Sequence, residues 1–220
     1  MVSRSAFMPT IADVNWEIKG RGDFNGDGRA DVIWRNRATG QNIGWLMDGL
    51  TVTMAAFLPT IADTNWEIVG VGDLDGDGKA DVVLRNGATG QNIAWLMNGP
   101  AVAVSAFLSP IADTNWKIVG VGELNGDGKA DILWRHATGL NVAWLMNGTT
   151  VVNSAFFATI TDEAWEIKSV GDRDGDGRVD IVWRHRISGA AIIWLMDGMT
   201  VKAAATLPPI ADINWEIVGQ

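Results

Sequence analysis

A nine-residue acidic segment occurs four times in this chain, and its spacing constrains the fold more than any other feature. The copies begin at Asp23, Asp73, Glu123 and Asp172, so the intervals between them are 50, 50 and 49 residues. The residue missing from the last interval falls in a turn that ends at Gly139. A fixed period that changes length only in a turn predicts a repeat architecture, because turns tolerate deletions that strands do not.

The segment has the composition of a cation-binding loop. Every copy places oxygen-bearing side chains at positions 1, 3, 5 and 9, and glycine at positions 4 and 6. Acids at this density repel one another unless a cation neutralises them, and calcium takes about six to eight oxygen ligands. Glycine at position 6 permits the sharp turn that aims positions 1, 3 and 5 at one point. We therefore predict one Ca²⁺ per repeat, four in the chain.

Position 7 would contribute its main-chain carbonyl while its basic side chain points to solvent. The predicted ligands are Asp23, Asn25, Asp27, Arg29, Asp31, Asp73, Asp75, Asp77, Lys79, Asp81, Glu123, Asn125, Asp127, Lys129, Asp131, Asp172, Asp174, Asp176, Arg178 and Asp180. The third copy has Glu123 where the others have aspartate, and its longer side chain is expected to weaken that site.

The loop is not an EF-hand, although it begins like one. An EF-hand needs a bidentate glutamate at position 12 and a helix on each side. Position 12 is occupied here by Trp34, Leu84, Trp134 and Trp183, and the residues around it are typical of β-strands. The loop therefore joins two strands. An acidic hairpin turn that binds no metal is the alternative interpretation.

The sequence of each repeat predicts four β-strands. Asn-Gly or Asp-Gly pairs follow the third strand, as expected of two-residue hairpin turns. The second strands are apolar on both faces, which indicates burial from both sides. Four-stranded antiparallel sheets of this kind, repeated about every 50 residues, are the blades of an all-β propeller. We predict a single repeat domain over 1–220, with blades near 15–57, 65–107, 115–157 and 164–206.

The two ends predict unpaired strands. Residues 5–10 match the end of a repeat and residues 214–219 match the beginning of one, so an extra outer strand and an extra inner strand are expected. Unpaired strands invite pairing with another chain. We therefore expect an incomplete ring, completed by self-association with a second copy or by further chain.

Composition excludes several classes of protein. The net charge of −9 argues against a nucleic-acid surface. Four Ca²⁺ would add +8 and leave −9 + 8 = −1, so the acidity is explained by the predicted sites. No run of 18 apolar residues predicts a membrane span, and the absence of cysteine excludes disulfides. Residues 1–7 lack the apolar core of a signal peptide, so a signal was removed or the chain is a piece of a longer one.

The loop Asp23–Asp31, followed by Val32, Ile33, Trp34 and Arg35, resembles the FG-GAP/VCBS repeat. That family builds the calcium-bearing propellers of integrin α-subunits, a fungal N-acetylglucosamine-binding lectin and many secreted bacterial proteins. The resemblance implies a structural role for the metal loops, ligand binding on the opposite rim or between blades, and a secreted or extracellular location. Members commonly have more blades than the four copies found here.

Nothing in the sequence predicts catalysis. The two histidines, His136 and His185, stand where the first two repeats have Asn36 and Asn86, so they are interpreted as polar turn residues. There is no cysteine or tyrosine and no nucleophile motif. We therefore expect that the protein is not an enzyme.

A second set of repeated residues is a candidate ligand site. Arginines end the second strands, asparagines start the third strands and tryptophans open the first strands near the rim. The set comprises Arg35, Arg85, Arg135, Asn42, Asn92, Asn141, Trp16, Trp66 and Trp116. The alternative is structural, with arginine pairing internally or stacking on tryptophan, and tryptophan filling the space between blades. Ala191 replaces the asparagine in the fourth repeat.

These features predict a calcium-stabilised propeller module for binding or adhesion, with lectin-like carbohydrate binding as one form of that role. The expected partners are a glycan or an extracellular protein. A purely structural repeat segment of a larger secreted protein is the second hypothesis, and an enzyme is the third.

Overall fold

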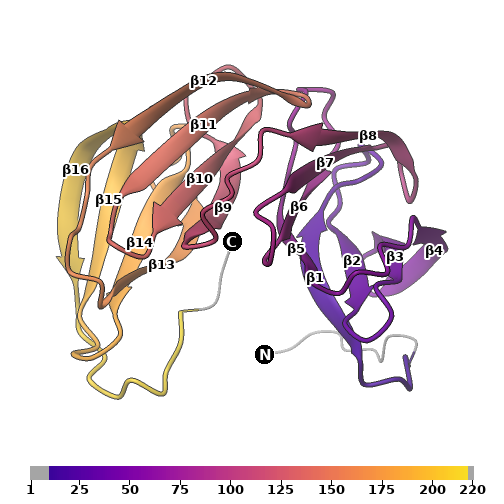
Figure 1. The fold of residues 1–220 in the computed structure, drawn as a ribbon, viewed down its shortest axis with the longest axis horizontal. Helices are drawn as coiled ribbons and strands as arrows, with labels where there is room; N and C mark the ends of the chain where they lie inside the picture. The colour runs from indigo at the N-terminus through magenta and orange to yellow at the C-terminus, as the bar shows by residue number, and fades with distance from the viewer. Residues whose placement is uncertain (1–9, 218–220) are drawn as a thin grey trace. The chain divides into compact units, whose positions relative to one another are not determined.

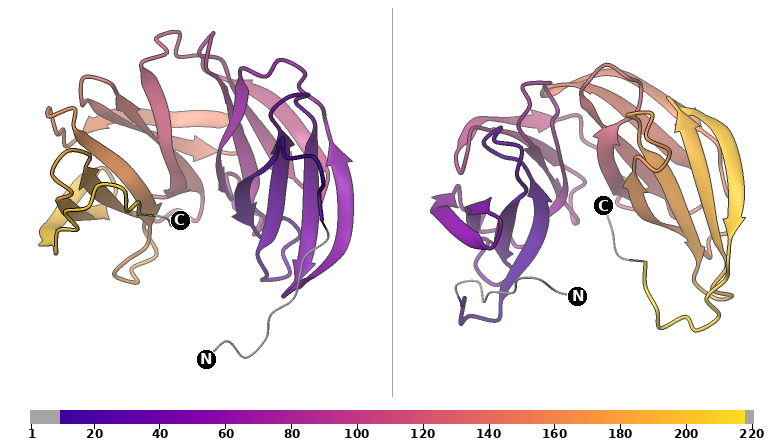
Figure 2. Two further views of the ribbon diagram at one scale, coloured as in Figure 1. Left: turned by 90° about the horizontal axis from the view of Figure 1, so that it is seen from below. Right: turned by 180° about the vertical axis from the view of Figure 1, so that it is seen from behind.

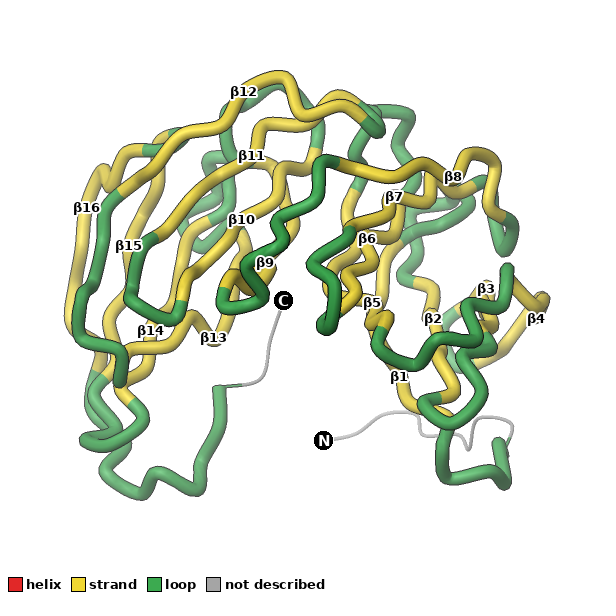
Figure 3. The backbone as a smooth tube through the Cα atoms, viewed as in Figure 1, coloured by secondary structure: helices red, strands yellow, loops and turns green. Residues whose placement is uncertain are grey.

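Residues 10–217 are described by a computed structural model, and all regular secondary structure in that range is β-strand (Figures 1 and 3). The strands are β1 (Trp16–Gly22), β2 (Asp31–Asn36), β3 (Asn42–Asp48), β4 (Thr51–Leu58), β5 (Trp66–Gly72), β6 (Asp81–Asn86), β7 (Asn92–Met97), β8 (Val102–Leu108), β9 (Trp116–Glu123), β10 (Ala130–His136), β11 (Asn141–Asn147), β12 (Thr150–Phe157), β13 (Trp165–Gly171), β14 (Asp180–His185), β15 (Ala191–Asp197) and β16 (Thr200–Leu207). Within this range there is no helix long and apolar enough to cross a membrane.

The strands form four separate antiparallel sheets in chain order. Each sheet contains four strands that pair with their sequence neighbours, in the order β1-β2-β3-β4 and likewise for the next three sets. Sheets of this kind are the blades of a propeller. The predicted fold class, all-β with repeated four-stranded antiparallel blades, is therefore confirmed. The chain divides into two compact units, residues 1–112 and 113–220, each containing two sheets.

The hairpin turn after each third strand differs from the sequence prediction. Asp48 pairs with Thr51, so the two turn residues are Gly49 and Leu50 rather than Asp48 and Gly49. Gly49 has a φ of 60°, and no described residue other than glycine has a positive φ. A glycine with positive φ at the first turn position is typical of type II′ rather than type I′ turns. The strand register therefore places the turn one residue later than the sequence predicted.

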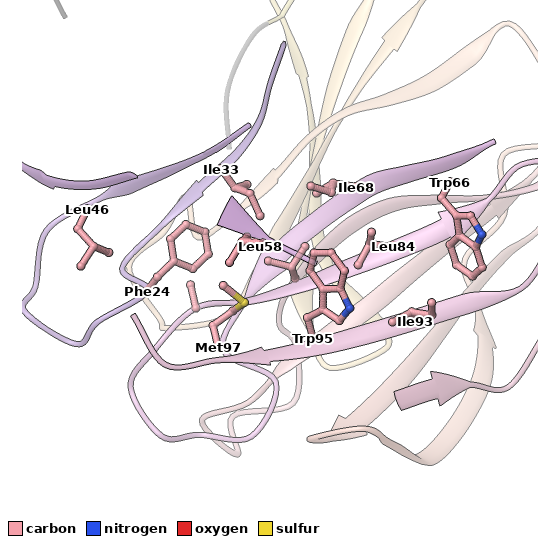
Figure 4. Close-up of a cluster of buried hydrophobic side chains, with 12 residues drawn as sticks. Phe24, Ile33, Leu46, Leu58, Trp66, Ile68, Leu84, Ile93, Trp95 and Met97 are labelled. Carbon is pink, nitrogen blue, oxygen red and sulfur yellow. The ribbon is translucent and has the colours of Figure 1, made fainter. Parts of the chain in front are cut away.

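The two sheets of each unit pack face to face around an apolar core (Figure 2). In the first unit, side chains from β2, β3 and β4 meet side chains from β5, β6 and β7 (Figure 4). The members include Phe24, Ile33, Leu46, Leu58, Trp66, Ile68, Leu84, Ile93, Trp95 and Met97. Trp95, Trp134 and Trp183 are among the largest fully buried side chains. Seven of the twelve tryptophans are buried, so most of them contribute to core packing.

Glycines in the first strands allow adjacent sheets to approach closely. A Cβ atom added to Gly20 in β1 would overlap Val71 of β5, and one added to Gly120 in β9 would lie 2.5 Å from Val170 of β13. No real Cβ atom shows such a contact, so these positions require glycine to bring the first strands of each unit together.

The predicted terminal strands fall largely outside the described part of the chain. Residues 5–9 and 218–219 are not described, and residues 214–217 follow a turn without strand pairing. The pairing of these segments stays a prediction.

Candidate metal centres and a candidate ligand pocket

Each acidic loop connects the first strand of a sheet to the second, so the sheet itself positions the oxygen atoms. In the second loop, Asp73, Asp75 and Asp81 offer carboxylate oxygens that lie within 4.8 Å of one another. Asp172, Asp174 and Asp180 do the same in the fourth loop. The first and third loops carry Asn25 and Asn125 at position 3. Oxygen atoms that converge in this way fit a divalent cation that prefers hard ligands.

The acid at position 1 accepts hydrogen bonds from main-chain N–H groups of its own loop. Asp23 Oδ2 accepts a hydrogen bond from Gly28 N at 2.6 Å, and Oδ1 accepts one from Gly26 N at 2.7 Å. The two glycines have φ values of 80° and 77°, which only glycine adopts readily. Burial opposes ionisation of Asp23, but these N–H donors outweigh it and hold the pKa of this carboxyl below its usual range. The loop therefore favours the charged carboxylate.

The acid at position 9 is buried and has a role that sequence reasoning missed. Asp81 is 1% exposed; its Oδ2 accepts a hydrogen bond from Leu74 N at 2.9 Å and its Oδ1 accepts one from Met97 N at 2.8 Å. One carboxylate thus ties the loop to β7. Burial raises the pKa of Asp81 to about 7, and burial has the same effect on Asp131. The available signal was an aspartate at the start of every apolar second strand, which sequence reasoning explained only as a cation ligand.

The position-7 side chains do not all point to solvent as expected. Lys79 Nζ lies 2.9 Å from Asp77 Oδ2, and Arg178 Nη1 lies 4.0 Å from Asp176 Oδ2. Lys79 thus folds back onto the acid at position 5, whereas Arg178 lies closer to Asp197, with its Nη1 3.2 Å from Asp197 Oδ1.

The arginines and asparagines of the predicted ligand set lie inside the fold. Arg35 is 1% exposed; its Nη1 donates to Gly40 O at 3.0 Å and Asn42 Oδ1 at 3.1 Å, and its Nη2 donates to Ile61 O at 3.1 Å. Asn42 Nδ2 donates to Pro59 O at 2.8 Å. These bonds join the turn after β2 to the segment that leads into the next repeat.

The other repeats contain the same arrangement. Arg85 donates to Gly90 O, Asn92 Oδ1 and Ile111 O, and Arg135 donates to Gly139 O, Asn141 Oδ1 and Ile160 O. Arg135 also stacks on Trp183, with its Cζ 4.7 Å from the ring centroid. In the fourth repeat Arg184 donates to Ile210 O and Asp212 O.

The tryptophans of the predicted set pack against phenylalanines of their own sheets. Trp16, Trp66 and Trp116 have ring centroids 6.5, 6.3 and 6.4 Å from Phe57, Phe107 and Phe156, respectively. Trp66 is buried, and Trp16 and Trp116 are half-buried. The structure therefore does not bring the tryptophans, arginines and asparagines together on one exposed surface.

The second unit contains a pocket of about 560 Å³ between the first strands of its two sheets. Its walls include Lys117, His136, Glu163, Trp165 and Glu166, together with Arg135. Lys117 stands where the other first strands carry glutamate, and no other repeat has an acid at the position of Glu163. Pockets that hold small molecules usually combine apolar walls with a few polar groups.

Comparison with the first unit explains the space in this pocket. There Lys19 of β1 contacts Glu17 at 2.8 Å and crosses to Glu67 of β5 at 3.1 Å. The residue equivalent to Lys19 in β9 is Val119, which lines the pocket and cannot form that bridge. The pocket therefore lies where the repeat symmetry is broken.

The histidines take the structural role of the asparagines they replace. His185 Nε2 lies 3.1 Å from Asp162 Oδ2, and its Nδ1 lies 2.8 Å from Ser188 Oγ. Although this resembles a Ser-His-Asp arrangement, Asn36 makes the same links, donating to Asp13 Oδ2 at 2.7 Å and accepting from its own turn. The shared pattern indicates that these side chains close the turn and link it to the aspartate before the first strand.

The sequence and fold identify the family. Residues 23–84, 73–134 and 123–183 match the model of the FG-GAP-like repeat. Together these matches cover more than half of the 220 residues, so the chain belongs to the FG-GAP-like repeat family. Each match runs from one acidic loop into the second strand of the next sheet, so successive matches overlap.

Three solved structures resemble the chain at low identity. A protein of unknown function from Bacteroides caccae is 13% identical with a TM-score of 0.49, covering 88% of this chain and 62% of that one. BBS1N in complex with ARL6DN is 12% identical with a TM-score of 0.47, covering 86% and 56%. The WD40 domain of SCAP from fission yeast is 11% identical with a TM-score of 0.39, covering 85% and 40%. The chain thus spans less than two thirds of each relative. No curated protein matches it in sequence.

Proposed function

We propose that the chain is a calcium-stabilised β-propeller module whose role is binding or adhesion. The observation that carries the proposal is the convergence of Asp73, Asp75 and Asp81 within 4.8 Å, in a loop that occurs four times. Calcium is favoured over magnesium because it accepts many carboxylate oxygens in a flexible geometry, whereas magnesium demands a near-octahedral shell and keeps its waters. The bound ion would link the first strand of each sheet to the second.

Thermal unfolding in EDTA and in calcium chloride tests the metal. An ion that binds only the folded state stabilises it by about 2.7 kcal/mol for each site when its concentration is 100 times the dissociation constant. The melting temperature should therefore rise with calcium and rise much less with magnesium at the same concentration. An unchanged melting temperature after chelation would contradict the proposal.

The pocket of the second unit supports a binding role. Trp165 supplies an aromatic wall, and Lys117, Glu163 and Glu166 supply polar groups. An indole face with hydrogen-bonding groups beside it suits a sugar ring, so we propose a lectin-like ligand for this pocket. Titration with N-acetylglucosamine and a wider glycan array would test it. Val119→Lys, which copies the residue of the first unit, should fill the pocket and abolish binding, whereas Lys19→Val should leave binding intact.

The setting proposed for this module is extracellular, where calcium is abundant, and the proposed partners are a glycan or an extracellular protein. Self-association through the terminal segments is part of the same proposal, and the solution mass with and without calcium tests it. The second candidate, a structural segment of a larger secreted protein, is favoured by the buried arginine and asparagine network of the repeats. That candidate predicts calcium stabilisation without any glycan binding.

A further inference from the structure

The second and fourth loops have the same acidic ligands but different surroundings. Both carry aspartate at positions 1, 3, 5 and 9, and in both loops the carboxylates of positions 1, 3 and 9 converge within 4.8 Å. Their four acidic positions alone would give the two loops equal affinity for a cation. In the second loop Lys79 contacts the position-5 acid Asp77. The fourth loop instead receives a lysine from another strand, and that lysine contacts the acids at positions 3 and 5.

Lys202 of β16 places its ammonium group on the fourth loop. Its Nζ lies 3.0 Å from Asp174 Oδ2 and 3.1 Å from Asp176 Oδ2. These aspartates occupy positions 3 and 5, and Asp174 belongs to the converging cluster. The ammonium group therefore bridges two of the oxygens that a divalent cation would need.

Lys202 lies at a β-bulge, which directs its side chain toward the fourth loop. Leu195 pairs with Ala203 and Met196 pairs with Val201, which leaves Lys202 as an extra residue in its strand. Bulges redirect a side chain and are typical of functional positions. The same bulge occurs in the other three sheets, where the extra residues are Thr53, Ala103 and Val152. Only the fourth sheet carries a charged residue at this position.

The fourth loop also lacks the apolar anchor of the others. Position 2 is Phe24, Leu74 or Leu124 in the first three loops, at most 1% exposed, but in the fourth it is Arg173, an exposed residue that donates to Ser169 Oγ. Asp172 is likewise exposed, whereas Asp73 is half-buried. A carboxylate that is more exposed is better solvated by water, so it gains less electrostatic free energy when it binds an ion.

We propose that Lys202 acts as a built-in cation that neutralises the fourth loop, so that this loop binds calcium more weakly than the second. This inference rests on the proposed calcium function. A calcium ion entering the fourth loop must displace an ammonium group that is tethered to the same sheet and therefore present at high effective concentration. When calcium is absent, Lys202 then supplies positive charge to two acids of the fourth loop.

Calorimetric titration of the full chain with calcium chloride tests this proposal. Lys202→Thr, which copies Thr53 of the first sheet, should tighten the weakest site by about tenfold, equivalent to about 1.4 kcal/mol. The gain should disappear when Asp172→Asn is added, which assigns it to the fourth loop. Arg37→Thr removes a basic side chain that contacts Asn15 and Glu17 rather than an acid of the four loops, and it should leave the isotherm unchanged.

The reciprocal variant keeps the proposal falsifiable if Lys202→Thr does not fold. Thr53→Lys places a lysine at the same bulge in the first sheet and should weaken one calcium site there by a similar factor. If calcium binds the wild-type chain but neither variant changes the isotherm, the inference is wrong and the calcium function stands. If calcium binds no form of the chain, the proposed function fails and the inference fails with it.

Discussion

Arg35 donates a hydrogen bond from its Nη2 to the main-chain oxygen of Ile61 over 3.1 Å, although Ile61 lies 26 residues further along the chain. The same guanidinium also donates hydrogen bonds from its Nη1 to Gly40 O and Asn42 Oδ1. The planar guanidinium has several N–H donors in fixed directions, so it can donate to carbonyl oxygens of two chain segments at once. A lysine ammonium group cannot do this. This bond links each repeat to the segment that begins the next one.

Replacing Arg35 with lysine should therefore destabilise the first unit. Lysine keeps the charge but leaves buried carbonyl groups without donors, so we expect a loss of about 2–4 kcal/mol in the free energy of unfolding. Urea unfolding followed by tryptophan fluorescence measures the loss. Arg37→Lys is the control, because the Arg37 side chain is 58% exposed and the change should cost less than about 0.5 kcal/mol. Equal stability of the two variants would contradict the assigned role.

Gly20→Ala should separate β1 from β5. The added methyl group would overlap Val71, and overpacking of this kind costs about 1–3 kcal/mol. Adding Val71→Ala should restore part of that loss, which a double-mutant cycle would measure as coupling between the two positions. Gly87→Ala is the control, because a Cβ atom there would lie 3.7 Å from its nearest neighbour, Asn65 O. Additive effects of the two substitutions would show that the close approach is unimportant.

Asp75→Asn should weaken the second cation site without changing the calcium-free protein. Asparagine already occupies this position in the first loop as Asn25, so the substitution fits the fold. Removing one carboxylate charge lowers calcium affinity, by about three- to tenfold. The reverse substitution, Asn25→Asp, should strengthen the first site. Calcium titrations of both variants measure the shifts, and a change in the same direction in both would contradict the assignment of position 3 as a ligand.

Acid should destabilise the protein through the aspartates that precede the first strands. The N–H of Asn65 and the side chains of Asn65 and Asn86 hold the pKa of Asp63 below its usual value of 3.8. A carboxyl with a depressed folded-state pKa stabilises the fold above the unfolded pKa, and this stabilisation is lost as the pH falls through the folded pKa.

Asp63→Asn should consequently lose less stability than the wild type when the pH is lowered from 6 to 3. Asp13, whose pKa is lowered chiefly by the N–H of Asn15, should behave in the same way. Urea midpoints at the two pH values in EDTA measure the difference. An equally steep loss in wild type and variant would show that these aspartates do not contribute.

The sequence alone was sufficient to predict the repeat, the four-stranded blade and the positions of the acidic loops. The reason is that the signals are local. The glycines at positions 4 and 6 of each acidic loop define a turn, and the continuous apolar run of Val82, Val83 and Leu84 defines a strand buried on both faces. The second-strand tryptophans were likewise interpretable as packing residues, because Leu84 replaces one of them.

Other features depended on residues far apart in the chain and were decided only by the tertiary structure. Arg35 could have faced a ligand, but the fold turns it toward Ile61. The strand register placed the turn at Gly49 and Leu50 and left Lys202 as the extra residue of a bulge. The acidic ligand positions do not distinguish the second loop from the fourth, since both carry aspartate at positions 1, 3, 5 and 9. Their difference arises because folding brings Lys202 within 3.0 Å of Asp174, 28 residues earlier in the chain, and electrostatic contacts over that separation exist only once the strands have paired.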